Sequence, residues 1–288
     1  MLELYSFIQL PMILDGKKIA QKIYSKLTDE ILTLKEKPCL GAVLVGSNPA
    51  SLRYIKQKKK NAKAIGMDFR LFSLPEDTTE AKLLTLIQNL NNDSSLSGYI
   101  VQLPLPSHID TLKVIESINP TKDVDGFHPI NQGKILIGEK DAFAPCTPLW
   151  VMEILRERDF VFPGSKIVIL GRSNIVGKPL AALCINAWAT VISCNSKTPD
   201  ISQYTKSADV VVLATGQVGV LRADMIGKDT IVIDVGFTVR DGVIYGDADF
   251  KPIHAQWNLI TPVPGWVGQL TVAMLLSNTL RAHTNNHK

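Results

Sequence analysis

Tyr54 and Lys58 stand four residues apart in a segment whose apolar spacing predicts a helix over residues 51–65. Side chains at this spacing share one helix face, so the pair is a candidate site, although the spacing by itself is a weak signal. An exposed lysine beside a half-buried tyrosine is the more common cause of the same spacing. A solvated helix face is also favoured by the run of nearby basic residues, which comprises Lys56, Lys58, Lys59, Lys60 and Lys63.

Gln102 is a polar residue near the end of a mainly apolar run, residues 98–103, which predicts a strand. It precedes Pro104 and Pro106, which end the strand. In parallel α/β folds the carboxyl ends of the strands face the ligand, so a polar side chain here is a candidate binding group. Asp125 lies in the string Asp-Val-Asp-Gly, where it could either contact a ligand or form an ordinary Asp-Gly turn.

Residues 171–177, Gly-Arg-Ser-Asn-Ile-Val-Gly, follow a predicted strand and open a predicted helix. Backbone amides at a helix N-terminus, approached closely through small residues, form a phosphate site. The string departs from the usual dinucleotide pattern, because Ser173 replaces the second glycine and the span is one residue longer. A structural turn is therefore the alternative to cofactor binding through Gly171, Arg172 and Ser173.

The next predicted strand, residues 190–194, ends in Asn195-Ser196-Lys197 and carries no acidic residue. NAD-specific folds place an acid there to bind the ribose 2′-hydroxyl. Arg172, Ser196 and Lys197 can instead donate hydrogen bonds to a 2′-phosphate, where such bonds are strong. This favours NADP over NAD, although a polar loop that binds nothing has the same composition.

These residues must be positioned by two alternating series of strands and helices. In the first series, strands are predicted over residues 39–45, 69–74 and 98–103, and helices over 16–34, 51–65 and 79–91. In the second, strands are predicted over 166–170, 190–194, 209–214 and 230–235, with helices over 149–158, from about 178, and over 271–283. This alternation predicts an α/β protein with two domains, the second a Rossmann-like parallel sheet.

The segment over residues 119–148 is rich in Pro, Gly and Asp, and we place the domain boundary there. The first domain is expected to cover residues 1–148 and to be completed by a C-terminal helix in 271–288. The second domain is expected to cover residues 149–270.

Bulk composition is that of a globular protein. The chain has 288 residues, of which 45% are hydrophobic and 20% charged, with a net charge of +4. No apolar run reaches the roughly 18 residues of a membrane span, and we expect no membrane or nucleic-acid partner. The spacing of the four cysteines fits neither a metal site nor a disulfide framework, so we expect no metal and a cytoplasmic location.

Six strings stand in sequence order and together identify a family. They are Tyr54-x-x-x-Lys58, residues 101–106 (Val-Gln-Leu-Pro-Leu-Pro), 122–127 (Lys-Asp-Val-Asp-Gly-Phe), 145–148 (Pro-Cys-Thr-Pro), 171–177, and 260–265 (Ile-Thr-Pro-Val-Pro-Gly). With them the chain closely resembles the bifunctional methylenetetrahydrofolate dehydrogenase/cyclohydrolase family, from about Met12 to the C-terminal helix.

The resemblance implies two reactions in one site of a tetrahydrofolate enzyme of one-carbon metabolism. NADP oxidises 5,10-methylenetetrahydrofolate to the 5,10-methenyl compound, which is then hydrolysed to 10-formyltetrahydrofolate, a donor for purine biosynthesis. It also implies a folate cleft between the two domains and a homodimer formed through the cofactor domain. A dehydrogenase with weak or lost cyclohydrolase activity and a non-catalytic cofactor-binding paralogue are the alternatives.

The resemblance also implies a role for individual residues. Lys58 matches the proton-transfer lysine, Gln102 its hydrogen-bond partner, Tyr54 the residue that packs on the folate, and Asp125 the anchor of the pterin ring. Further substrate contacts are implied for Val101, Leu103, Pro264, Gly265 and Gly268. Cofactor contacts are implied for Gly171, Arg172, Ser173, Ser196 and Phe237.

Two regions depart from the family or lie outside it. Trp266 and Gln269 stand where the family usually has glycine and proline. We expect the indole of Trp266 to cover the mouth of the cleft and leave both activities intact. Residues 1–11 carry no strand or helix signal that pairs with the later pattern, and we expect them to be dispensable.

Overall fold

The computed structural model describes residues 16–256, 259–265 and 267–286. Its first unit is built on a parallel sheet of three strands in the order β2-β1-β3. The strands are β1 (Cys39–Val45), β2 (Asp68–Leu74) and β3 (Gly98–Val101). Every residue of the central strand β1 is buried, as its continuous apolar sequence predicts for a strand covered on both faces.

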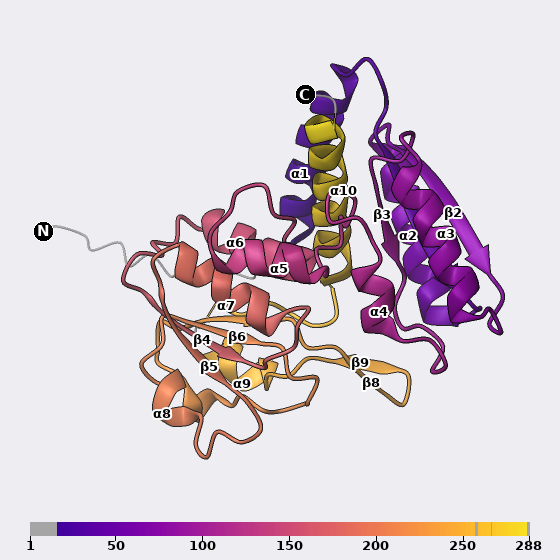
Figure 1. Ribbon diagram of the computed structural model, residues 1–288. Helices are drawn as coiled ribbons and strands as arrows, with labels where there is room; N and C mark the ends of the chain where they lie inside the picture. The colour runs from indigo at the N-terminus through magenta and orange to yellow at the C-terminus, as the bar shows by residue number, and fades with distance from the viewer. Residues whose placement is uncertain (1–15, 257–258, 266, 287–288) are drawn as a thin grey trace, which may run out of the picture.

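Helices cover both faces of this sheet (Figure 1). Cys39, Val43 and Val45 of β1 pack towards α3 (Glu80–Asn92), whose Leu83, Ile87 and Leu90 are buried there. The intervening residues Leu40 and Ala42 pack on the opposite face. That face is covered by α1 (Gly16–Leu32), α2 (Pro49–Ala64) and α10 (Val267–Asn286).

The second unit contains a parallel sheet of four strands in the order β5-β4-β6-β7. The strands are β4 (Lys166–Leu170), β5 (Thr190–Cys194), β6 (Val210–Leu213) and β7 (Ile231–Asp234). α6 (Cys146–Arg156) and α7 (Gly177–Asn186) pack on one face, and α9 (Phe250–Ala255) on the other. Two α/β units with parallel sheets, the second Rossmann-like, confirm the predicted fold class.

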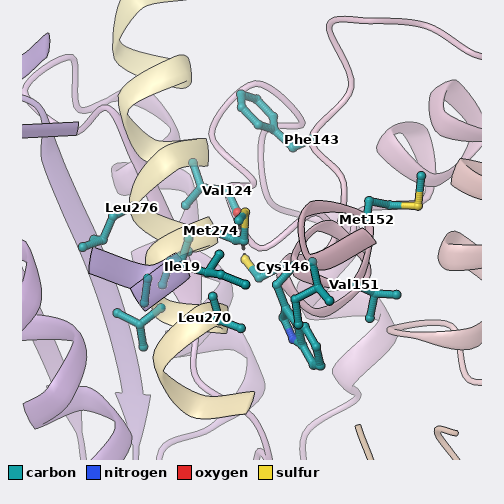
Figure 2. Close-up of a cluster of buried hydrophobic side chains, with 14 of the residues drawn as sticks. Ile19, Val124, Phe143, Cys146, Val151, Met152, Leu270, Met274 and Leu276 are labelled. Atoms are coloured by element: carbon teal, nitrogen blue, oxygen red, sulfur yellow. Dashed lines mark hydrogen bonds between the residues drawn. The ribbon is translucent and has the colours of Figure 1, made fainter. Parts of the chain in front are cut away.

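One buried cluster connects the two units. Figure 2 shows Ile19 of α1, Leu270 and Met274 of α10, and Cys146 and Val151 of α6 in this cluster. α10 lies along α1 and also contacts α2 and α6. The C-terminal helix therefore packs against the first unit, although it follows the last strand of the second.

Several elements were not predicted. The segment over 119–148, interpreted as a linker, contains α5 (Pro129–Leu136), and α4 (Thr111–Glu116) precedes it. The second unit also contains α8 (Ser202–Thr205), a 3-10 turn (Ala223–Met225) and a hairpin of β8 (Thr238–Arg240) and β9 (Val243–Tyr245). α10 begins at Val267, four residues earlier than predicted, so Gly268 belongs to a helix. None of the helices in the described residues is long and apolar enough to span a bilayer.

Candidate active site

Lys58 and Gln102 meet at the carboxyl end of β3. Lys58 Nζ donates a hydrogen bond of 2.9 Å to Gln102 Oε1, and Gln102 Nε2 donates one of 2.8 Å to the carbonyl of Leu103. The second bond fixes the orientation of the amide, because only its oxygen is then free to face the lysine. The backbone N–H of Gln102 also donates to the carbonyl of Val43. The lysine thus has a rigid acceptor anchored to the sheet.

The burial of Lys58 distinguishes it from the other lysines of α2. Only 9% of its surface is exposed, and it shares a buried helix face with Ser51, Ile55 and Ala62. Lys56, Lys59, Lys60 and Lys63 are exposed. The solvated-face interpretation is therefore wrong for Lys58 and correct for its neighbours. α2 begins after Asn48, whose Oδ1 accepts hydrogen bonds from the N–H groups of Ala50 and Ser51.

Burial sets the protonation of this site. It lowers the pKa of Lys58, while the nearby charge of Asp125 opposes that effect. Burial raises the pKa of Asp125 in turn, and the charge of Lys58 lowers it. A buried amine with a lowered pKa spends part of its time neutral, which is the condition for a lysine to act as a base.

The turn that carries Asp125 is held by other residues. Asp123 accepts hydrogen bonds from the N–H groups of Gly126 and His128 and from Asn131 Nδ2. Gly126 has a φ of +75°, which favours glycine, and an added Cβ would lie 2.6 Å from the backbone of Ala144. Because Asp123 and Gly126 form the turn, Asp125 remains available to the site.

Cys146 is part of the site, although the spacing of the cysteines in the sequence predicts no role for it. Its Sγ lies 3.8 Å from Asp125 Oδ1 and 3.9 Å from the carbonyl of Val124. Burial raises the pKa of this thiol well above its ordinary value, so it stays protonated and donates to the carboxylate. The one signal in the sequence was its position in the Pro-Cys-Thr-Pro string.

Tyr54 lies one turn before Lys58 on α2 and is 37% exposed. The first turn of α10 adjoins it, since a Cβ added to Gly268 would lie 3.9 Å from Tyr54 Cε1. Pro264 and Gly265, just before this helix, are exposed. Trp266 lies outside the described residues, as do residues 1–15, so the expectations for them stay predictions.

Val101 and Leu103 differ in how they can contribute to binding. The side chain of Val101 is buried in the cluster beneath α3, on the face of the sheet opposite α2. Only its backbone is therefore available to a ligand beside Lys58. Leu103 is partly exposed and supplies the carbonyl that orients Gln102.

A cavity of about 320 Å³ lies at the carboxyl ends of β4, β5 and β6. Gly171 closes its base with a φ of +118°, and a Cβ there would lie 2.3 Å from the carbonyl oxygen of Ala214. A Cβ on Gly177 would lie 2.1 Å from the carbonyl oxygen of Gly171. The cavity shape therefore requires glycine at both positions. Its lining includes Gly171, Arg172, Ser173, Cys194, Asn195, Ser196, Thr215, Gln217 and Val220.

The polar groups of this cavity suit a phosphorylated ligand. Arg172 is exposed and its guanidinium donates a hydrogen bond of 2.7 Å to the carbonyl of Ser193 on β5, three residues before Ser196. Among the described residues, no acidic side chain lines the cavity. Ser173 Oγ accepts from the N–H of Val176 and so shapes the turn into α7. Phe237 is 49% exposed at the start of the β8–β9 hairpin and is not part of the lining.

Two family models match the chain. The tetrahydrofolate dehydrogenase/cyclohydrolase catalytic domain matches residues 14–125, and the NAD(P)-binding domain of the same name matches residues 145–287. The bifunctional protein FolD of Nautilia profundicola is 46% identical over 277 residues, covering 95% of this chain and 97% of that protein. That of Exiguobacterium sibiricum is also 46% identical, over 94% of this chain and 98% of that protein.

Solved structures show the same similarity. The bifunctional FolD dehydrogenase/cyclohydrolase of Campylobacter jejuni superposes with a TM-score of 0.92 at 45% identity, covering 95% of this chain and 99% of that one. The FolD of Trypanosoma brucei, solved with NADP and an inhibitor, gives a TM-score of 0.91 at 36% identity, over 96% and 98% of the two chains.

Proposed function

Because the chain belongs to the tetrahydrofolate dehydrogenase/cyclohydrolase family, we infer that it oxidises 5,10-methylenetetrahydrofolate with NADP and hydrolyses the product to 10-formyltetrahydrofolate. The observation that carries this conclusion is the buried Lys58, held by Gln102 beside Asp125. A non-catalytic paralogue has no need of a buried lysine with a lowered pKa. Both reactions are assigned to this one site.

NADP, when bound, accepts the hydride from the bridging carbon of the folate. The protein contributes to this step by holding the folate in position relative to the nicotinamide. We assign contact with the folate to Tyr54, Asp125 and the residues that precede α10. Hydrolysis of the methenyl cation consumes one water and releases one proton. Neutral Lys58 accepts a proton from the attacking water, and Gln102 Oε1 keeps the amine in place. Asp125 balances the charge of the protonated amine.

We assign the cofactor to the cavity at β4, β5 and β6. Its glycine-lined base and the N-terminus of α7 suit a pyrophosphate. We assign the 2′-phosphate to Arg172 and Ser196, which both line the cavity, and no acidic side chain of the described residues lines it to serve as the usual partner of NAD. Phe237 would reach the cofactor only from outside this cavity.

The domain division proposed from the sequence has support in the packing. We assign residues 1–148 to the folate domain, completed by residues 271–288, because α10 packs along α1. We assign residues 149–270, which include the four-stranded sheet, to the cofactor domain; α6 and α10 each cross one limit of this range. We also assign the enzyme to the cytoplasm and its product to purine biosynthesis, by analogy with the family.

The test of this function follows the two reactions separately. Purified protein should reduce NADP in the presence of 5,10-methylenetetrahydrofolate, with clear preference over NAD. It should also hydrolyse added 5,10-methenyltetrahydrofolate without any nucleotide. Oxidation without hydrolysis would favour a dehydrogenase that has lost cyclohydrolase activity, and NADP binding without either reaction would favour a non-catalytic paralogue.

Arg172→Ala should raise the KM for NADP and leave the KM for NAD unchanged.

We propose a homodimer whose interface includes Trp188. This residue lies between α7 and β5, the edge strand of the second sheet, and is 81% exposed. Its φ of +68°, just after the end of α7, is a backbone conformation that favours glycine over tryptophan. Ile185, in the last turn of α7, is also 55% exposed. An exposed aromatic beside an edge strand suits a symmetric interface between two copies.

Trp188→Glu should therefore separate the dimer. Sedimentation at micromolar concentration should give about twice the chain mass of 31.6 kDa for the native protein and a single chain for the variant. Leu32→Glu is the matched control, because Leu32 is 77% exposed on α1 in the other unit. An unchanged mass for Trp188→Glu would place the interface elsewhere.

A further inference from the structure

Two buried carboxylates, Asp234 and Asp247, lie next to the cofactor cavity and take no part in the chemistry assigned above. Asp234 ends β7 and is 3% exposed, and Asp247 follows β9 and is fully buried. Buried carboxylates are costly unless they are well hydrogen-bonded. The groups that they bind therefore indicate what they do.

Asp247 binds both ends of the loop that follows β6. Its Oδ2 accepts hydrogen bonds from Thr215 N at 2.6 Å, Thr215 Oγ1 at 2.8 Å and Gly216 N at 3.1 Å. Its backbone carbonyl accepts from the N–H of Val220 at 2.8 Å. Thr215, Gln217 and Val220 form one wall of the cofactor cavity. One residue thus fixes the wall at its start and at its end.

Asp234 holds Asp247 in position. It accepts hydrogen bonds from the N–H groups of Asp247, Ala248 and Gly236, at 3.1, 2.9 and 2.9 Å. Its own N–H donates to Thr261 Oγ1 at 2.7 Å, which connects it to the segment before α10. Burial raises the pKa of Asp234 to about 6, and the charge of Asp247 adds to the effect.

Two glycines make room for this pair. A Cβ added to Gly236 would lie 2.2 Å from Asp247 Oδ1, and one added to Gly246 would lie 2.2 Å from Asp234 Oδ2. In the described part of the chain, Asp247 Oδ1 has no hydrogen-bond partner. All the side-chain hydrogen bonds of Asp247 with the loop therefore depend on a single oxygen, Oδ2. The side-chain amide of an asparagine also has one such oxygen.

We propose that Asp247 is a positioning residue for the dinucleotide, which holds residues 215–220 in the shape of the cavity wall before the cofactor binds. The proposal rests on the assignment of this cavity to NADP. A loop that is already ordered loses little conformational freedom on binding, so affinity is gained without a direct contact. Without Oδ2, two backbone N–H groups and one hydroxyl lose their acceptor, and the loop no longer has one preferred shape.

Three variants test this role in the full-length enzyme. Asp247→Ala should raise the Kd for NADP about tenfold, equivalent to about 1.4 kcal/mol. Asp247→Asn keeps an oxygen for Thr215 and Gly216 and should restore most of the affinity. Asp224→Ala, an exposed aspartate in the same unit, should bind NADP within about twofold of wild type. Hydrolysis of 5,10-methenyltetrahydrofolate, measured without nucleotide, should be unchanged in all three and reports that the first unit is folded.

A second measurement distinguishes positioning from direct contact and does not depend on the folding of Asp247→Ala. Hydrogen exchange of residues 215–220 in the NADP-free enzyme should be slow in the wild type and faster in Thr215→Val, which lacks the hydroxyl that donates to Asp247 Oδ2 and accepts from the N–H of Gln217. Equal exchange in the two proteins, or NADP affinity within about twofold of wild type in Asp247→Ala, would overturn the proposal. Failure of the wild type to bind NADP would instead overturn the assigned function.

Discussion

Lys58→Met should lose nearly all cyclohydrolase activity, with a fall in kcat of about 10²- to 10⁴-fold, the usual contribution of a positioned base. The variant keeps a long unbranched side chain in a site that is 9% exposed, so the packing of α2 against the sheet is preserved. It removes the amine that donates to Gln102 Oε1, and with it the group that accepts the proton. Oxidation of 5,10-methylenetetrahydrofolate depends mainly on how the protein positions the folate and NADP, so its kcat should fall less than that of hydrolysis.

The measurement is hydrolysis of added 5,10-methenyltetrahydrofolate, alongside NADP titration and a thermal melt. Lys59→Met is the matched control, since Lys59 is the next residue of the same helix and is exposed. The control should keep both activities, and both variants should bind NADP normally. Undiminished hydrolysis by Lys58→Met would remove this lysine from the mechanism.

Long apolar strands and amphipathic helices could be predicted from the sequence because their signal is local. β1, β4 and β5 have the predicted limits, because each has an apolar stretch that is followed directly by a glycine or polar residue, namely Gly46, Gly171 or Asn195. α5 was missed because it is short and depends on a cap, in which His128 Nδ1 accepts from the N–H of Ile130. The β8–β9 hairpin was missed for a similar reason, as its strands are three residues long and partly exposed.

The site could be predicted in part. The position of Gln102 followed from a general property of parallel sheets, that their carboxyl ends face the ligand. The burial of Lys58 could not be predicted from the sequence. Four neighbouring lysines are exposed, and only the tertiary packing of α2 distinguishes Lys58 from them. The contact of Cys146 with Asp125 joins positions that are far apart in the chain, and the bonds of Asp247 to residues 215–220 are of the same kind. Local patterns carry no information about such pairs.

The central claim is that Lys58 works as a neutral base, and this predicts how hydrolysis depends on pH. Burial moves the lysine pKa below its ordinary 10.5, and the charge of Asp125 only partly reverses the shift. A base acts in its unprotonated form, so kcat for hydrolysis rises with pH and becomes constant above the pKa of Lys58. Below that midpoint the rate should fall about tenfold for each pH unit.

The most direct test is the pH profile of kcat for nucleotide-free hydrolysis of 5,10-methenyltetrahydrofolate, corrected at each pH for the rate with Lys58→Met. That correction removes the uncatalysed attack of hydroxide. We predict a rise to a plateau with a midpoint below 10.5, the ordinary lysine value. A corrected rate that is independent of pH, or that is still rising at 10.5 as an ordinary lysine would require, would contradict the account.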